Sequence, residues 1–399
     1  MNRRKVLQSL AGLPWIAGGM LRGQTHDHAA MPATEGQFNP WVVSDGNGGF
    51  YLAYVHRKDG RSNVLLQRSL MNGQFTPAIR VNDTLGDSAV RNENPPKVAV
   101  GSRGEIYVVW ANERERWKGN IRFSRSLDGG KSFEPALNVN SDAGGPATAR
   151  AFQSILVDPA GRIFIAWIDE RNKSTSDRGA EVWMAMSENR GKTFSQDRKI
   201  LSDVCECCRL TLAADRSGVI YLSYRTVPRS GPMFRDIAVA RSTDQGRTFR
   251  SSIVHQDRWE LEACPVAGAS MTVDLSGRTH VVWFTQHGDK PKVYLATSLG
   301  QDSSFGTPID FDPAQKLAKH ASAIAVGDGR VLLAWDDLQE SSLVKWGLYT
   351  PASPAVQLMG TIKGASYPVV ARSGRQICIV ALQPDRPEIF RRIQSIGTL

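Results

Sequence analysis

The stretch that decides the fold is ILVDPAGRIFIAWIDE, residues 155–170. An apolar segment leads into the turn sequence DPAG, and a second apolar segment follows the turn. Short runs rich in β-branched and aromatic residues indicate β-strands, and a tight turn that ends in glycine typically joins two antiparallel strands. We therefore predict a β-hairpin over these residues.

The same hairpin pattern recurs along the chain after residue 35. Strong copies are KVAVGSRGEIYVVWANE (97–113), LAADRSGVIYLSYRT (212–226), MTVDLSGRTHVVWFTQ (271–286) and AIAVGDGRVLLAWDDL (323–338), and weaker copies lie at 41–57 and 369–383. The turn glycines stand 45 to 59 residues apart, which suits one four-stranded unit per repeat. We count seven units, and a ring of six with one extra closing unit stays open as an alternative.

Most units carry a large ring six residues after the turn glycine. These positions are Tyr54, Trp110, Trp167, Tyr224, Trp283, Trp335 and, in the last unit, Val380. A ring at a fixed position of a repeat fills the space between packed sheets, so we predict core residues rather than ligand contacts. His280 stands where other units have Tyr107 and Phe164, and it is predicted to be a packed core histidine. Cys378 is predicted to be a small buried apolar residue.

A second motif falls between the hairpins, in SLDGGKSF (126–133), SENRGKTF (187–194) and STDQGRTF (242–249). Its Asp and Gly favour a turn, and its Phe is expected to pack beneath that turn. The motif resembles the Asp-box, or BNR repeat, of the sialidase superfamily. The resemblance covers nearly all of the chain after residue 35. It implies an all-β fold, a β-propeller of four-stranded antiparallel blades, formed by one domain over residues 35–399.

The resemblance also implies a site in a central funnel, which would take a glycan or another acidic small ligand. Sialidases grip the substrate carboxylate with three arginines and use a tyrosine nucleophile, activated by a glutamate, with an aspartate as acid/base. The candidates for substrate binding are Arg150, Arg209 and Arg225, and the catalytic candidates are Tyr367, Glu262 and Asp169. At the place of the family's first arginine, the stretch FNPW (38–41) has Asn39 instead, which counts against sialic acid as the substrate.

Four of the five cysteines are expected to lie close together. Cys205, Cys207 and Cys208 lead into the fourth unit, and Cys264 leads into the fifth. Neighbouring units of a ring place these segments side by side. Three interpretations stay open. The first is a disulfide that joins Cys205 or Cys207 to Cys264, as expected in an oxidising compartment. The second is a copper or zinc site formed by all four thiols, and the third is redox chemistry of the thiols.

The first 34 residues are interpreted as an export signal. NRRKVLQ places paired arginines before the apolar run LAGLPWIAGGML, a pattern that resembles a twin-arginine signal. A periplasmic or secreted protein is expected, with no membrane span after signal removal. The formal net charge of +10 is spread along the chain without a dense basic run, so no nucleic-acid partner is expected.

Two functions follow from these patterns. The first is an exported glycoside hydrolase that acts from the chain end on sialic acid or on another acidic glycan. The alternative is a non-catalytic periplasmic propeller that binds a glycan, a protein or a soft metal. The sequence leaves the substrate and the oligomeric state open.

Overall fold

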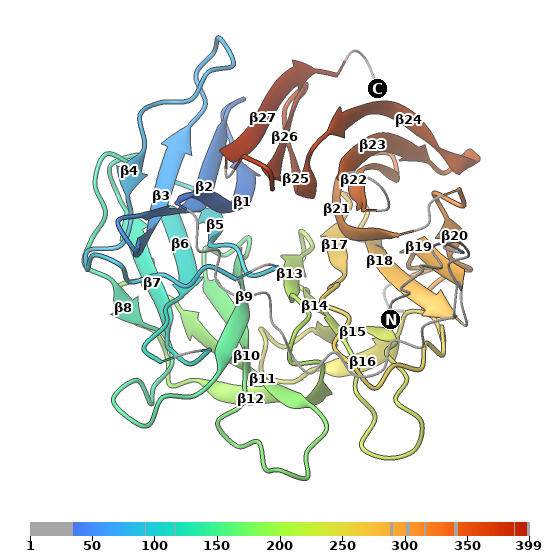
Figure 1. Cartoon of the computed structure of the whole chain (residues 1–399), viewed down its shortest axis with the longest axis horizontal. Coiled ribbons are helices and arrows are strands. Elements are labelled where there is room, and N and C mark those ends of the chain that lie inside the picture. Colours follow the sequence, from blue (N-terminus) through green and yellow to red (C-terminus); the bar gives the residue numbers. More distant parts are fainter. Residues whose placement is uncertain are drawn as a thin grey trace, which may run out of the picture.

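The computed structural model describes residues 35–396, except 92, 116, 288–289, 301–303, 315–316, 339–341 and 387. The export signal expected at residues 1–34 lies outside this part of the chain. Every regular element described is a β-strand, and the strands form seven antiparallel sheets arranged in a ring (Figure 1). The β-propeller is confirmed with seven blades, so the six-bladed alternative is wrong. No helix suited to crossing a membrane occurs within these residues.

Each blade runs from an inner strand at the axis to an outer strand at the rim. The inner strands are β1 (Gly36–Ser44), β5 (Lys97–Val100), β9 (Arg150–Val157), β13 (Thr211–Ala214), β17 (Ser270–Val273), β21 (Ala318–Gly327) and β25 (Ser366–Ser373). The second strands are β2 (Phe50–Lys58), β6 (Ile106–Ala111), β10 (Ile163–Asp169), β14 (Ile220–Arg225), β18 (Thr279–His287), β22 (Arg330–Asp337) and β26 (Gln376–Gln383).

The third strands are β3 (Arg61–Arg68), β7 (Ile121–Ser126), β11 (Ala180–Ser187), β15 (Ile237–Ser242), β19 (Lys290–Thr297), β23 (Leu343–Thr350) and β27 (Glu388–Ser395). The outer strands are β4 (Ile79–Arg80), β8 (Leu137–Asn138), β12 (Arg198–Val204), β16 (Arg250–Ile253), β20 (Ile309–Asp310) and β24 (Ser353–Lys363). Six of the seven blades have the predicted four strands, and three strands of the last blade lie within the described residues.

The ring closes where blade 7 packs against blade 1. The Ser44 hydroxyl donates to the Ser373 hydroxyl at 2.8 Å, and the Arg391 guanidinium donates to the Gln37 side-chain oxygen at 2.9 Å. A buried apolar cluster that includes Tyr54 and Val380 fills the space between these two blades. Contacts between residues more than 320 positions apart thus join the two ends of the described chain.

The aromatic side chains at the fixed repeat position form the cores between blades, as predicted. Tyr54, Trp110, Trp167, Tyr224, Trp283, Trp335 and Val380 are all buried, with exposed fractions of 6% or less. His280 is buried among them and hydrogen-bonds Thr297 and Asp274, and Cys378 is also buried, so both core predictions are confirmed.

The predicted turns between third and outer strands form through side-chain hydrogen bonds. In blade 2 the Ser126 hydroxyl donates to Asp128, and the Gly130 N–H donates back to that hydroxyl at 2.8 Å. Gly130 has a φ of +86°, a conformation that glycine adopts without a steric penalty. The same bonds recur at Ser187 and Ser242, so these polar residues are used within the turns.

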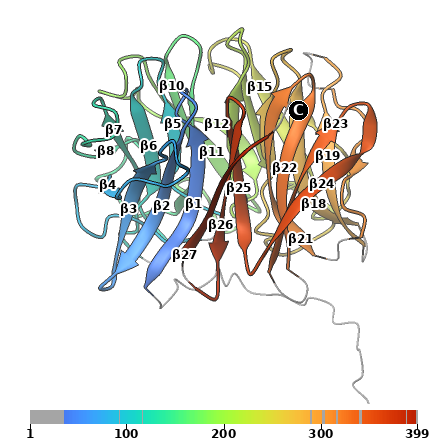
Figure 2. The ribbon, with the colours of Figure 1, turned by 90° about the horizontal axis from the view of Figure 1, so that it is seen from above.

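The two faces of the ring have different roles because consecutive strands are antiparallel. Figure 2 shows the strands running between the faces. The inner strands begin on the face that also carries the loops between second and third strands, and we call it the start face. The hairpin turns after the inner strands and the turns of the second motif lie on the opposite face, which we call the end face. Loops from all seven blades therefore meet around the axis on the start face.

The core role of His280 predicts a specific pH dependence of stability. Burial lowers the pKa of His280 below its usual value of about 6.5, although Asp274 opposes this shift. The unfolded chain then binds a proton more readily, so His280 stabilises the fold above that value and this contribution is lost as the pH falls below it. Chemical denaturation at several pH values will show a steeper loss of stability between about pH 7 and pH 5 for the wild type than for His280→Phe. Equal slopes would contradict the prediction.

Candidate functional site

The inner strands of four blades bend at the same place, just after they begin. Asn39, Phe152, His320 and Tyr367 have positive φ values of 53°, 56°, 25° and 52°. The strand pairing shifts at each of these positions, which marks a β-bulge. Bulges re-aim side chains and are common beside active sites. The same backbone feature therefore recurs near the start of four inner strands.

His320 and Tyr367 belong to neighbouring blades and contact each other directly. Their rings stack with centroids 3.8 Å apart. His320 Nδ1 lies 2.7 Å from Asp336 Oδ2, and the Tyr367 backbone N–H donates to the same oxygen at 2.9 Å. Asp336 is fully buried at the end of β22, and burial raises its pKa, but His320 and these bonds lower it overall. An ionised Asp336 fixes the Nδ1–H tautomer of His320 and leaves Nε2 as the basic nitrogen.

Glu93 and Arg209 form a buried ion pair across the axis. Glu93 precedes β5 and Arg209 precedes β13, and their side chains are 3.2 Å apart. Glu93 also accepts a bond from the Gly268 N–H at 3.3 Å, and Arg209 donates to the carbonyl of Ala321. The start segments of blades 2, 4, 5 and 6 are thereby joined at one point.

Tyr367 lies within the electrostatic reach of this ion pair. Burial raises the pKa of its phenol strongly, the negative charges of Glu93 and Asp336 raise it further, and Arg209 opposes them. Tyr367 is only partly buried, so its ring borders the surface of the start face. At neutral pH the phenol is protonated, so in proton transfer it can act as a donor.

Two lysines lie in the same region. Lys97 is buried with its ammonium 3.0 Å from the ring centre of Trp41, and burial together with Arg209 lowers its pKa well below the usual range. Lys319, next to His320, is partly exposed, and burial lowers its pKa while Asp336 and Glu93 oppose the shift. The partly exposed Lys319 therefore favours a negatively charged ligand at the start face.

Arg91 is a further cation near this face. Its guanidinium lies 5.0 Å from the ring centre of Trp117 and 4.0 Å from Glu113. Its Nε and Nη2 atoms are buried and have no hydrogen-bond partner within the described part of the chain. The Asn39 side-chain amide donates to the Arg91 carbonyl at 2.6 Å. Asn39 thus positions a segment that itself carries an arginine.

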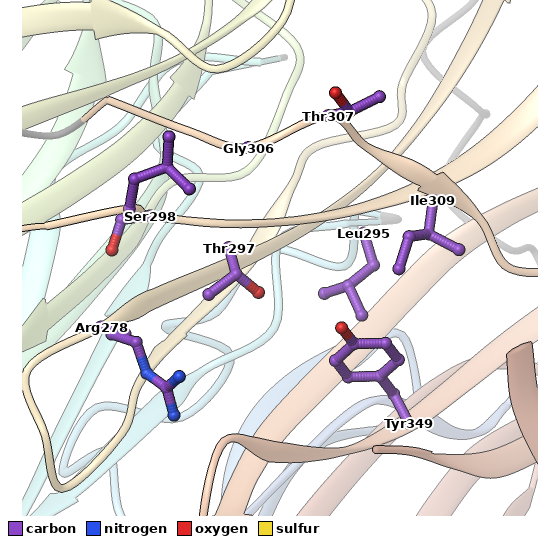
Figure 3. Close-up of a pocket in the computed structure, with 9 residues that line it drawn as sticks. Arg278, Leu295, Thr297, Ser298, Gly306, Thr307, Ile309 and Tyr349 are labelled. Atoms are coloured by element: carbon purple, nitrogen blue, oxygen red, sulfur yellow. The ribbon is translucent and has the colours of Figure 1, made fainter. Parts of the chain in front are cut away.

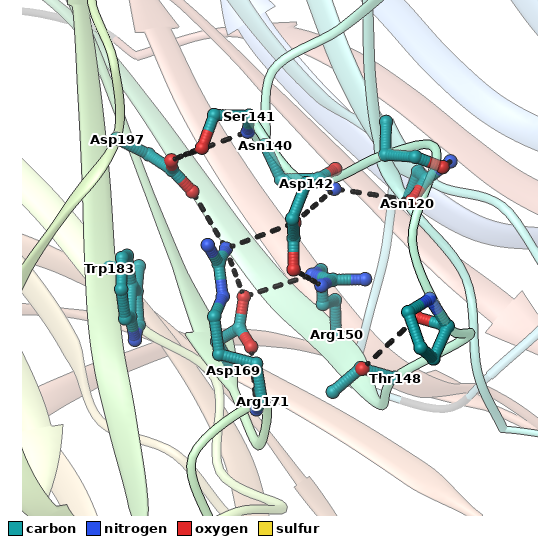
Figure 4. A network of polar contacts seen from close by, with 12 residues as sticks. Asn120, Asn140, Ser141, Asp142, Thr148, Arg150, Asp169, Arg171, Trp183 and Asp197 are labelled. Carbon is teal, nitrogen blue, oxygen red and sulfur yellow. Dashed lines mark hydrogen bonds and ion pairs between the residues drawn. The ribbon is translucent and has the colours of Figure 1, made fainter.

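Two of the predicted site residues, Arg150 and Asp169, lie in a polar network between blades 2 and 3 (Figure 4). The Arg150 Nε–H donates to Asp169 at 2.9 Å, and its Nη2 lies 2.5 Å from Asp142. Asp169 also accepts from Trp167 and Arg171 and is fully buried. Burial alone raises the pKa of Asp169, but the bond from Arg171 and the charge of Arg150 lower it overall. The network holds Asp169 as a carboxylate.

The other predicted residues are placed separately. Arg225 is fully buried and donates to the carbonyls of Arg235, Ala267 and Phe284. Glu262 is exposed on the segment that leads to Cys264. Of the three predicted arginines, Arg209 is the one whose charge acts on Tyr367.

Glu93, His320 and Asp336 are missing from the predicted catalytic set. His320 occupies the same repeat position as Tyr367, directly before the alternating part of an inner strand, and this shared position was the available signal. Glu93 and Arg209 are 116 residues apart in the sequence and come into contact because the ring closes. No local sequence pattern therefore predicts this pair.

The cysteines gather between blades 4 and 5, as predicted. Cys207 and Cys264 form a disulfide with their Cα atoms 6.3 Å apart. Cys205 and Cys208 are buried free thiols, and Cys205 Sγ lies 3.5 Å from Cys207 Sγ. Cys205, Cys207 and Cys264 are also close enough together to hold a metal ion, but the disulfide uses two of the three sulfurs and favours the disulfide interpretation.

The two free thiols influence each other. The hydrogen bond with Cys208 and burial raise the pKa of Cys205. Burial also acts to raise the pKa of Cys208, but the bond from Cys205 and the charge of Arg225 lower it to about 7. The two buried thiols therefore differ in acidity.

Two hollows lie away from these clusters. One of about 290 Å³ lies between blades 5 and 6, with Arg278 and Tyr349 on its wall (Figure 3). Another of about 720 Å³ is lined by the ends of β1, β5, β9 and β13 and their turns, so it opens on the end face. The titratable residues around Tyr367 line neither of them.

The fold is shared with solved propellers that act on glycans. A polysaccharide lyase of family PL25, an ulvan lyase bound to -[GlcA(1-4)Rha3S]-, has a TM-score of 0.61 and 12% identity over 91% of this chain and 94% of its own. A Hadza microbial sialidase has a TM-score of 0.52 and 15% identity, covering 88% of this chain and 74% of its own. An α-L-arabinanase of Penicillium chrysogenum has a TM-score of 0.53 and 12% identity, covering 90% and 93%.

The predicted likeness to sialidase propellers is therefore confirmed for the fold. No protein-family model matches the sequence, and no curated protein matches it.

The Cys207–Cys264 disulfide predicts a measurable contribution to stability. It closes a segment of 57 residues, and Cys264→Ser is expected to lower the free energy of unfolding by about 2–4 kcal/mol in chemical denaturation. Reductant will destabilise the wild type by a similar amount and will leave Cys264→Ser nearly unchanged. A wild type that is insensitive to reductant would refute this role.

Proposed function

We propose that this protein is an enzyme that cleaves an acidic glycan by β-elimination on its start face. The observation that carries the proposal is the contact of three groups suited to proton transfer: His320, its partner Asp336 at 2.7 Å, and Tyr367, whose ring is 3.8 Å from that of His320. A histidine oriented by a buried carboxylate is a general base, and a protonated phenol beside it is a general acid.

The chemistry follows from these roles. His320 Nε2 takes the proton α to the carboxylate of a uronate sugar. The electron pair of that C–H bond forms a C=C bond while the C–O bond to the next sugar breaks. The leaving oxygen receives the phenolic proton of Tyr367. One carboxylate-bearing sugar becomes unsaturated, and no water is consumed.

The positive charges of the start face would stabilise the charge that develops on the uronate carboxylate. Arg209 and Lys319 lie in the same cluster as His320 and Tyr367, as the charges that act on these groups indicate. Arg91 has two buried nitrogens without hydrogen-bond partners in the described chain and is suited to gripping a carboxylate or sulfate of a neighbouring sugar.

The comparisons give independent support for a glycan as the substrate. The ulvan lyase has a TM-score of 0.61 to this chain, and its bound ligand contains GlcA, a sugar with a carboxylate. Because identity is only 12%, this support concerns the class of ligand and not its sequence.

Hydrolysis of sialic acid or another acidic sugar is the second candidate. The observation that favours it is the negative charge of Glu93 close to Tyr367, because sialidase chemistry needs a carboxylate beside the nucleophilic phenol. Arg209 would then grip the substrate carboxylate. Arg150 and Arg225 would have to exchange their present partners within the protein to join it.

The proposal places this activity outside the cytoplasm, after export by the twin-arginine signal. The Cys207–Cys264 disulfide supports an oxidising compartment. A copper or zinc ion at Cys205, Cys207, Cys208 and Cys264 is not part of the proposal, because that disulfide would first have to open.

A panel of acidic polysaccharides and a fluorogenic sialoside tests the proposal. Elimination is expected to give products with the ultraviolet absorbance of an unsaturated uronate. Tyr367→Phe and His320→Gln are each expected to lower the rate about 10²–10⁴-fold, because each removes a proton-transfer group. Tyr349→Phe, in the hollow between blades 5 and 6, is the matched control and is expected to keep the wild-type rate.

Two other outcomes would decide against elimination, and a third would decide against Tyr367 as its acid. Release of free sugar without ultraviolet absorbance would establish hydrolysis instead. Binding of an acidic glycan without any cleavage would establish the non-catalytic alternative. A fully active Tyr367→Phe variant would remove the proposed acid from the mechanism.

A further inference from the structure

The cysteine cluster holds sulfur in two oxidation states side by side. Cys207 and Cys264 form a disulfide, whereas Cys205 and Cys208 are free thiols. Cys205 and Cys208 have the spacing C-x-x-C within CECC (205–208), and their side chains are hydrogen-bonded. This spacing allows two thiols to join as a disulfide without a long loop. The cluster therefore contains one disulfide and a dithiol able to form another.

The two pairs are close enough to react with each other. Cys205 Sγ lies 3.5 Å from Cys207 Sγ, within the range of reacting atoms in a near-attack arrangement. Arg235 Nη1 lies 3.6 Å from Cys205 Sγ, and Arg235 is itself buried. Its positive charge opposes the hydrogen bond with Cys208 and the burial, which together raise the pKa of Cys205.

We propose that this cluster is a thiol–disulfide exchange site, in which the dithiol of Cys205 and Cys208 reduces the disulfide of Cys207 and Cys264. The Cys205 thiolate attacks Cys207 Sγ, forms a Cys205–Cys207 bond and releases Cys264 as a thiolate. The Cys208 thiolate then attacks Cys205 Sγ and releases Cys207. The two protons of the dithiol pass to Cys207 and Cys264, so atoms and electrons balance.

The exchange would transfer the reduced state from buried cysteines to a pair that includes a partly exposed cysteine. Cys205, Cys207 and Cys208 are buried, whereas Cys264 is partly exposed. The exchange oxidises the buried pair of Cys205 and Cys208. The two reducing equivalents pass to Cys207 and Cys264, and Cys264 is the accessible member. A small or protein disulfide outside the fold is then the chemical class of oxidant. This oxidant accepts the two reducing equivalents at Cys264 and is released as two thiols. The Cys205–Cys208 and Cys207–Cys264 disulfides are then both formed.

Thiol counting with oxidised glutathione tests the proposal on the full chain. In the structure Cys205, Cys208 and Cys378 are free. We expect the thiol count after denaturation to fall from three to one, with two molecules of glutathione released per chain. Cys378→Ala is the matched control and is expected to fall from two to zero. Cys208→Ser, which lacks one member of the dithiol, is expected to form no second disulfide within the protein.

Peptide mapping identifies the intermediate without any variant. After thiols are blocked with N-ethylmaleimide, trypsin yields residues 200–209 with Cys205, Cys207 and Cys208, and residues 259–278 with Cys264. Exchange predicts a fraction in which 200–209 holds an internal disulfide and Cys264 carries the label. The proposal fails if the two peptides are always linked and the count stays at three. It also fails if a bound copper or zinc ion accounts for the thiols.

Discussion

Closure of the ring is the constraint on which the rest of this structure depends. Each blade is a local product of its own sequence, but its inner strand needs neighbours on both sides to bury its surface. Backbone N–H groups of one inner strand donate to hydroxyls of the previous one: Leu212 to Ser154 at 3.0 Å, Ala323 to Ser270 at 3.2 Å, and Val370 to Ser322 at 3.2 Å. Once blade 7 meets blade 1, the seven start segments share one axis.

The chemistry of the start face is a direct result of this geometry. Glu93 and Arg209 are buried together at the axis, and neither charge would tolerate that burial without the other. Around them, bulged strands present His320 and Tyr367 in a conformation that costs of order 1–3 kcal/mol per residue and that surrounding structure must hold in place. Strained, charged and buried groups at one point of a fold are typical of a site selected for function rather than for stability.

The repeated sequence pattern predicted the features that recur in each blade. It did not predict the side-chain contacts that occur at single places in the ring. The hairpin phase identified Trp110 and Trp167 as core, and the position of Cys264 at the start of the next unit predicted that it lies close to the other three clustered cysteines. Arg150 and Arg225 occupy the predicted face, yet they bind carboxylates and carbonyls of the protein, a difference that only side-chain geometry reveals.

The most direct measurement is a crystal structure of the Tyr367→Phe variant with an acidic oligosaccharide. The account predicts the ligand on the start face, with a sugar carboxylate bound by Arg209 or Lys319 and the hydrogen α to it facing Nε2 of His320. A ligand bound instead on the end face or between blades 5 and 6, with His320 and residue 367 untouched, would contradict it.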